Sequence, residues 1–560
     1  MQKLATFEEK QDVLVLRSAR RRQDILLFIV TFVTVLCVAP LLTLVGLNYS
    51  IGVTVGGIAA LLVALAVVRW HTLGFFLVVV CVTLFEQDPL SANILTDRTN
   101  IYYWPQSLTG LPERPIGFLF LLILFSFLCY RFIKRKPVIY GGALLWPFLG
   151  FMACVVVGAL YGASTGGDPK NIILEVRPFW YLFVAYLLAY NLVTQKSYLR
   201  AFFWIAIISA GIKGLQGCYI YFIVLHRSLE GQNEIMAHEE SFFFVAMLLL
   251  IILFSMHYRY RPQLYTALAV TPFALVALAA NNRRADYVAL LVGVLVSWIL
   301  IFLIKKQSRK RLAIGMAIFL VFGGAYVAVF ARSSSSLAAP ARSLVSVVNP
   351  SAADARDASS NLYRTIEDFD LKYTAKQNFP LGYGFGKEFL QPKILPNIRS
   401  EDPVYLLIPH NTIFWVWMRL GVAGFVFFWY LIGSTIVRGC AIVRQLRDPY
   451  LQLMAIYIVA IIFMEIVVAF ADYQLYAFRN VLYLGLLMGV LLRLPALDNE
   501  APAEQKSIRK RIRGIQYRYE QGGRFVRRSS SVQAWEIIEN ESDTQKRAKI
   551  KVKVGVLDGK

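Results

Sequence analysis

Charged side chains are scarce in this 560-residue sequence: Asp, Glu, Lys and Arg make up 17% of it, whereas 57% is hydrophobic. Repeated uncharged runs of about 20 residues remain, and a run of that length is enough to cross a bilayer as a helix. These features exclude a soluble globular protein. They predict an all-α polytopic membrane protein.

Cysteine is also rare, and no pattern of cysteines is visible that would form a disulfide framework or a metal site. The six cysteines lie in or beside the apolar runs: Cys37, Cys81, Cys129, Cys154, Cys218 and Cys440. A cleavable signal peptide is not expected either, because the first apolar run is long and leads directly into a second. We expect neither a metal nor a cofactor.

The apolar runs predict about fourteen membrane-spanning helices and one large extracytoplasmic loop with short helices. The helices are expected near residues 25–45, 51–68, 72–85, 115–132, 143–162, 174–192, 201–223, 241–256, 264–280, 286–304, 312–330, 412–437, 451–471 and 476–492. The predicted division is an N-terminal tail (1–23), helices one to eleven (24–330), the large loop (331–410), helices twelve to fourteen (411–494) and a basic tail (495–560).

Basic residues in short loops set the predicted orientation, since they are retained in the cytoplasm. Clusters at residues 20–22, 131–136 and 305–311 all fall on one face. Both termini are therefore predicted to be cytoplasmic, in a bacterial inner membrane, with loop 331–410 outside. The net charge of +23 then needs no nucleic acid. The basic run at 509–513 can bind RNA in principle, but we expect it to meet anionic lipids.

The large loop has a helical pattern of its own. The stretch "NLYRTIEDFDLKYTAKQ" predicts a helix with one apolar face formed by Leu362, Ile366, Phe369 and Tyr373. The "PLGYGFG" that follows predicts a glycine-containing turn. A long loop with its own periodicity is usually functional, so a folded cap over the membrane helices is expected.

The few ionisable residues within the predicted spans fall only in their outer halves. They include Glu175, Arg177, Lys213, Arg284, Arg419, Glu465, Asp472 and Arg479. Such residues are costly in a bilayer and mark functional sites. A transporter would need polar groups near the midplane as well. This distribution instead favours an enzyme that acts on a lipid-linked substrate in the outer leaflet.

Each of these residues also has a simpler interpretation. Arginines at helix ends, such as Arg177 and Arg284, often extend to headgroups or form structural pairs. Lys213 and Arg419 lie deeper, which favours a functional or paired role, with Glu465 as a possible partner. His410, one of five histidines, would by itself more often be incidental than catalytic.

The segment "PLGYGFG" and the later "PHNTIFWVWMRLGVAG" resemble the signature of the O-antigen ligase and O-antigen polymerase family, which has a glycine turn, a His-Asn pair and a Gly-x-x-Gly helix. "NNRRADYVALLVG" and "EVRPFWYLFVAY" are similar to its arginine stretches, and Arg364 to the arginine that opens the loop helix. Two departures are Arg283 in place of a serine and Arg419 in place of an acidic residue. The predicted helices also outnumber the roughly twelve usual in the family.

The resemblance implies glycan transfer from a polyprenyl-diphosphate carrier to an acceptor hydroxyl, either on lipid A core or on another lipid-linked glycan. Arg177 and Arg284 are expected to grip the diphosphate, because the guanidinium binds phosphate bidentately. His410 suits a general base and Asn411 could orient it. Arg364, Lys213 and Arg419 are further expected binding residues. Direct attack would be inverting and would need no metal.

Two other functions compete with this interpretation. A lipid-linked oligosaccharide flippase is also rich in helices and arginine, but the one-sided charge distribution argues against it. A non-catalytic membrane scaffold would leave Lys213 and Arg419 without a reason. The sequence does not separate a ligase from a polymerase.

Overall fold

The computed structural model describes residues 51–86, 102, 114–135, 139–227, 234–258, 260–331, 333, 338–349, 355–399 and 403–499. These ranges contain helices and no strand. By its contacts the chain divides into residues 1–499 and residues 500–560. The predicted N-terminal tail, the predicted helix at 25–45 and the basic tail beyond residue 499 lie outside the described residues.

The observed helices follow the predicted ones closely. Before the large loop they are α2 (Ile51–Arg69), α3 (His71–Leu84), α4 (Pro115–Ile133), α5 (Leu145–Ser164), α6 (Pro169–Leu192), α7 (Lys196–Tyr219), η2 (Ile220–Val224), α8 (His238–Met256), α9 (Arg261–Asn281), α10 (Arg284–Ile304), η3 (Lys306–Ser308) and α11 (Arg309–Phe330). The large loop contains α12 (Ala339–Val348) and α13 (Ala355–Gln377). The chain then forms α14 (Thr412–Gln445), α15 (Pro449–Ala469) and α16 (Phe478–Asp498).

Eleven of the described helices are long and apolar enough to cross a membrane. The predicted all-α, multi-pass membrane architecture is thereby confirmed, although the count of fourteen is not. Of the other three predicted spans, two are the shorter apolar helices α2 and α3 and the third is the run at 25–45.

Burial separates central helices from peripheral ones. In α15 and α16, 78% of the residues in the apolar 18-residue stretch of the helix are buried, whereas in α11 the value is 0%. The closest helix pairs are α6 with α16, α7 with α9, and α10 with α15. Helices in a bilayer associate through side-chain packing and buried polar contacts, so α15 and α16 form the centre around which the others pack.

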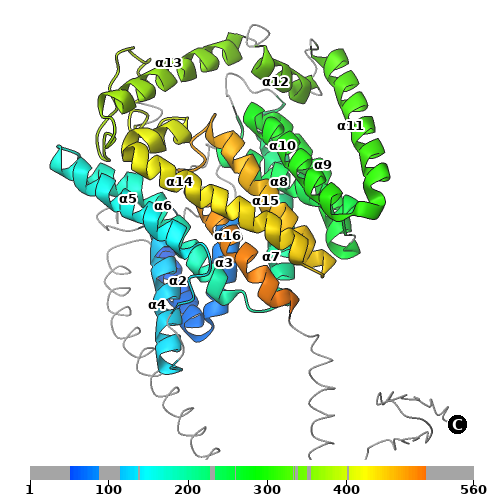
Figure 1. Ribbon diagram of the computed structural model, residues 1–560, viewed down its shortest axis with the longest axis horizontal. Coiled ribbons are helices and arrows are strands. Elements are labelled where there is room, and N and C mark those ends of the chain that lie inside the picture. The colour runs from blue at the N-terminus through cyan, green and yellow to red at the C-terminus, as the bar shows by residue number, and fades with distance from the viewer. Residues whose placement is uncertain are drawn as a thin grey trace, which may run out of the picture. The chain divides into compact units, whose positions relative to one another are not determined.

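Helices α12 and α13 of the large loop lie at one end of the helix bundle (Figure 1). There α12 packs against α10 and α13 packs against the start of α14. The predicted helix is confirmed, but its apolar face is not the one that is buried, since Leu362 and Phe369 are 63% and 44% exposed. The buried face carries Glu367, Asp370 and Leu371 instead. A helix that covers a polar site turns polar groups inward, which reverses the pattern expected of a soluble helix.

The glycine turn inserts into a break in α14. Gly421 interrupts this helix with φ 62° and ψ −159°. The amides of Tyr383 and Gly384 donate to the carbonyl oxygens of Met418 and Arg419, at 2.7 and 3.1 Å. A Cβ at Gly421 would lie 2.2 Å from the Pro380 oxygen, so only glycine fits this contact. The two glycine motifs therefore form one structural unit.

Candidate functional site

His410 lies at the end of the large loop beside a buried glutamate. Its ring Nδ1 is 3.2 and 3.3 Å from the two carboxylate oxygens of Glu367 on α13. The backbone N–H of His410 also donates to Glu367, at 3.0 Å. The glutamate side chain is 1% exposed and the histidine side chain 24%. This arrangement fixes the imidazole and directs Nδ1 to the carboxylate, so that Nε2 is the nitrogen left for chemistry.

Two tyrosine rings flank this histidine. The ring of Tyr363 lies edge-on to the His410 ring at 5.6 Å, and the ring of Tyr473 lies 6.3 Å from it. Tyr363 comes from α13 and Tyr473 from the segment between α15 and α16. The base candidate is thus enclosed by elements that are more than 60 residues apart in the sequence.

Two arginines, Arg284 and Arg364, lie near the His410–Glu367 pair, with Arg283 beside them. Arg284 begins α10, and its Nη2 is 3.1 Å from the Asn361 side-chain oxygen while Nη1 is 3.4 Å from the Ser346 hydroxyl. Arg364 is on α13, one turn before Glu367. Burial lowers its pKa, the charges of Arg283 and Arg284 lower it further, and Asp472 opposes them. A cluster of like charges of this kind is suited to bind a multivalent anion.

Arg283 belongs to a second group of charges beside the first. It pairs with Glu234, which also lies 2.7 Å from Nε2 of His238. The other ring nitrogen of His238 is 3.4 Å from Asp472. Burial alone would lower the pKa of Arg283, but the carboxylates of Asp472 and Glu234 raise it above its ordinary value. Arg283 and His238 thus alternate with the carboxylates of Glu234 and Asp472 in one chain of contacts.

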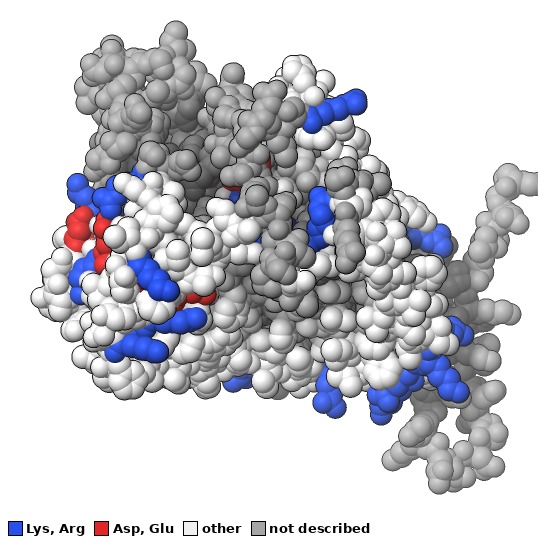
Figure 2. Space-filling model, turned by 90° about the horizontal axis from the view of Figure 1, so that it is seen from above, with Lys and Arg blue, Asp and Glu red and all other residues white. Residues whose placement is uncertain are grey.

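The charged groups described above lie at one end of the bundle, as the sequence predicted. The site uses the starts of α8, α10 and α14 and the segment after α15. At the opposite end, Lys305 donates to the His257 backbone oxygen at 2.8 Å and Lys196 pairs with Asp448 at 2.7 Å. Figure 2 views the molecule from above, and among the described side chains on that face basic ones predominate over acidic ones.

Lys213 lies in a separate buried cluster next to the start of α8. It pairs with Glu86 and lies 3.8 Å from Glu240, with 0% of its side chain exposed. Arg479 pairs with Glu240 at 2.6 Å. Glu465, which the sequence offered as a possible partner for Lys213 and Arg419, pairs with neither. Lys213 pairs with Glu86 and Arg419 with Glu175, and Glu465 instead accepts from Asn480 at 3.4 Å. Glu86 follows the end of α3, which packs against the helix of Lys213, α7. The carboxylate nearest to Lys213 therefore comes from the end of α3.

Arg419 is paired with Glu175 at 2.6 Å, and both side chains are 0% exposed. It also donates to the backbone oxygens of Gly384 and Leu407, each at 3.0 Å. This places Arg419 beneath the glycine turn rather than beside His410. Arg177 lies two residues after Glu175 on α6, which packs chiefly against α16. The predicted site residues are thus brought together only in part.

Asn411 does not orient His410, because its side-chain oxygen accepts from the amide of Phe414 at 3.1 Å and caps α14. Asn411 also hydrogen-bonds to Asp368. Burial raises the pKa of Asp368 to about 6, although this hydrogen bond and the nearby charges of Lys372 and Arg364 lower it. Glu367 takes the orienting position instead. The signal that could have indicated Glu367 was its place one helical turn after Arg364, on the same face of the predicted helix.

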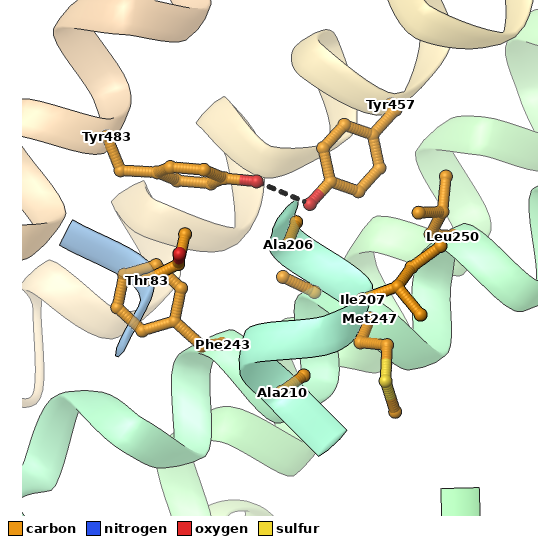
Figure 3. Close-up of a pocket in the computed structure, with 10 residues that line it drawn as sticks. Thr83, Ala206, Ile207, Ala210, Phe243, Met247, Leu250, Tyr457 and Tyr483 are labelled. Carbon is orange, nitrogen blue, oxygen red and sulfur yellow. Dashed lines mark hydrogen bonds between the residues drawn. The ribbon is translucent and has the colours of Figure 1, made fainter. Parts of the chain in front are cut away.

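The cavity drawn in Figure 3 lies inside the bundle and not at this site. It is lined mostly by apolar side chains, and none of the lining residues is charged. The hydroxyls of Tyr457 and Tyr483 point toward one another across it at 2.8 Å, and the Thr83 hydroxyl donates to Ser209 at 2.9 Å. These polar groups satisfy each other, so the cavity offers no unmatched group to a substrate.

The described residues contain no group of three or more His, Cys, Asp or Glu side chains placed to hold a metal ion. The described part of the site is therefore built from an imidazole, carboxylates and guanidinium groups. Such a set can bind an anionic group and accept a proton next to it.

Residues 267–429 match the family model described as O-Antigen ligase. The matched span runs from α9 into α14 and so includes Arg283, Arg284, Glu367 and His410, together with the glycine turn. No curated protein matches the chain. This match confirms the family resemblance predicted from the sequence for residues 267–429, and it supports a glycan-transfer role for this multi-pass membrane protein.

Proposed function

We propose that the protein transfers a glycan from a polyprenyl-diphosphate carrier to an acceptor hydroxyl on the extracytoplasmic face of the bacterial inner membrane. Two observations support this location. The site charges are grouped at one end of the bundle, and basic residues lie at the helix ends on the other side, as is typical of the cytoplasmic face. In this orientation both termini are cytoplasmic and residues 331–410 form the outer cap. The apolar carrier tail remains in the bilayer while its diphosphate reaches the cations.

The diphosphate is bound by Arg284 and Arg364, with Arg283 beside them. Guanidinium groups remain charged at any working pH and bind phosphate oxygens in pairs. As the bond between sugar C1 and the phosphate oxygen breaks, its electron pair moves to that oxygen. The arginines stabilise this developing charge, which is the main electrostatic requirement of the reaction. Because they neutralise the diphosphate, we propose a metal-independent reaction.

His410 is the general base. Its Nε2 takes the proton of the acceptor hydroxyl while that oxygen forms the new bond to C1, and Glu367 stabilises the resulting imidazolium through Nδ1. Attack by the acceptor opposite the leaving diphosphate inverts the anomeric centre. No covalent intermediate with the protein is required.

The remaining predicted residues have supporting roles in this proposal. Lys213 and Arg419 have no exposed side-chain surface, so they hold the α8 start and the glycine turn rather than touch substrate. Asn411 caps the helix that follows His410. Arg177 is half-buried on α6, where we propose that it contacts the carrier headgroup.

The observation that carries the proposal is the His410–Glu367 pair next to the arginine cluster. The test is glycan transfer by the purified protein from a polyprenyl-diphosphate oligosaccharide, with chelator present. We expect activity in the wild type and loss of at least about 100-fold in His410→Ala and Arg284→Ala, both folded. Full activity of His410→Ala would remove the base assignment, and loss of wild-type activity with chelator would remove metal independence.

The acceptor is assigned by product length in the same assay. Polymer formation from the lipid-linked glycan alone indicates a polymerase, whereas a single transfer to lipid A core indicates a ligase. Movement of the substrate across the bilayer without transfer would replace both with a flippase, for which the family match offers no support.

A further inference from the structure

Glu234 lies between two cations of the site and has no part in the proposed reaction. Its carboxylate pairs with Arg283 and, at 2.7 Å, with Nε2 of His238. Its side chain is 13% exposed. Both ring nitrogens of His238 face carboxylates, since Nδ1 is 3.4 Å from Asp472, and this placement favours the doubly protonated, cationic ring.

The two carboxylates that hold His238 differ in how firmly they are fixed. Asp472 is 4% exposed, and its side chain accepts from the amide of Tyr473 at 2.9 Å and from Gln474 at 3.4 Å. These contacts anchor Asp472 to its own segment. The carboxylate contacts of Glu234 are with Arg283 and His238, the cations themselves. Of the two, Glu234 is the one whose position depends on the cations.

A mostly buried cation needs a nearby anion when the site is empty, because an uncompensated buried charge is strongly destabilising. The side chain of Arg283 is 18% exposed, so it needs such an anion, and Glu234, whose side chain is 13% exposed, supplies it. An arriving diphosphate brings several anionic oxygens, which suit the same guanidinium donors. Glu234 and the diphosphate therefore compete for Arg283.

We propose that Glu234 is an internal counter-ion that occupies Arg283 and His238 in the empty site and is displaced by the diphosphate of the lipid-linked substrate. This rests on the proposed function, since it takes the diphosphate as the ligand. Glu234 is a positioning residue. When polyprenyl diphosphate is the leaving product, the return of Glu234 to the two cations helps to release it.

A competing counter-ion and a structural ion pair predict opposite effects of a neutral Glu234 variant on diphosphate affinity. If Glu234 only held the arginine in place, its neutral variant would bind the diphosphate more weakly. As a competitor, its neutral variant binds the diphosphate more tightly and releases the product more slowly.

The experiment uses the full-length protein in detergent and farnesyl diphosphate as the probe, with affinity measured by titration calorimetry. For Glu234→Gln we expect the Kd to fall about tenfold, the change typical of one close charge contact. Glu234→Asp keeps the charge and is expected to bind as the wild type does. Glu388→Gln is the matched control, because Glu388 also pairs with an arginine, Arg399 at 2.5 Å, but on the surface of the large loop. Its Kd should not change.

Kinetics provide a second measurement. Glu234→Gln should slow multiple-turnover glycan transfer several-fold while the single-turnover rate stays the same, because product release and not chemistry is affected. An unchanged or higher Kd for Glu234→Gln would overturn the counter-ion role while leaving the proposed function intact. If the wild type itself does not bind farnesyl diphosphate, the diphosphate assignment of the proposed function fails and the counter-ion role fails with it.

Discussion

Replacement of Glu367 by glutamine tests how the histidine is activated. The Glu367 side chain is 1% exposed and contacts His410 through two carboxylate oxygens and the backbone N–H. A hydrogen bond to a charged group contributes about 1.5–3 kcal/mol and a neutral one about 0.5–1.5 kcal/mol, so the loss is about 1–1.5 kcal/mol when the imidazolium forms. This corresponds to a fall in kcat of roughly 5- to 13-fold.

The assay is the transfer reaction at saturating donor, with the KM for the donor measured in parallel. The KM should change little, because the glutamate faces the histidine and not the expected phosphate position. Asp370→Asn is the control: Asp370 lies nearly one turn further along α13, is 0% exposed, and accepts from the Lys393 amide at 3.1 Å. Full activity of Glu367→Gln, or an equal loss in Asp370→Asn, would refute the orienting role of Glu367.

Three further predictions concern stability. Gly421→Ala should destabilise the fold by about 3 kcal/mol or more, because a Cβ would lie 2.2 Å from a backbone oxygen at a φ of 62°, whereas Gly433→Ala on the same helix has nothing within 4 Å and should not destabilise; thermal melting compares them. Arg419→Met should lower the melting temperature more than the double variant Arg419→Met with Glu175→Met, since the single change leaves a buried carboxylate without its cation, typically at a cost of about 3–5 kcal/mol; equal losses would contradict this. The pKa of Asp368 is raised from 3.8 to about 6, so the folded state holds this proton more tightly than the unfolded state does, and stability from this group falls as the pH rises from 3.8 to 6. Above pH 6, Asp368→Asn should therefore be more stable than the wild type, by about 1 kcal/mol or less because the group is partly exposed, and should melt at a higher temperature. Near pH 4 the two should melt alike.

The helices and their order could be predicted from the sequence, because a bilayer permits little else for long uncharged runs. The starts of α4, α8, α10 and α14 each fall within a few residues of the predicted positions. The grouping of ionisable residues at one end could also be predicted, since it follows from helix direction alone. His410 and Arg284 could be selected from the motif and its place in the chain.

Which side chains meet was decided by the tertiary structure. Glu367 and His410 are 43 residues apart, and Glu175 and Arg419 are 244 apart, so their pairing depends on how α13 and α6 lie against α14. The same holds for the glycine turn, whose amides reach the break at Gly421 only after the loop folds back. Composition and periodicity determine which segments enter the membrane, because that depends on each segment alone. The partners of buried charges depend on packing between segments, and therefore only the folded structure fixes them.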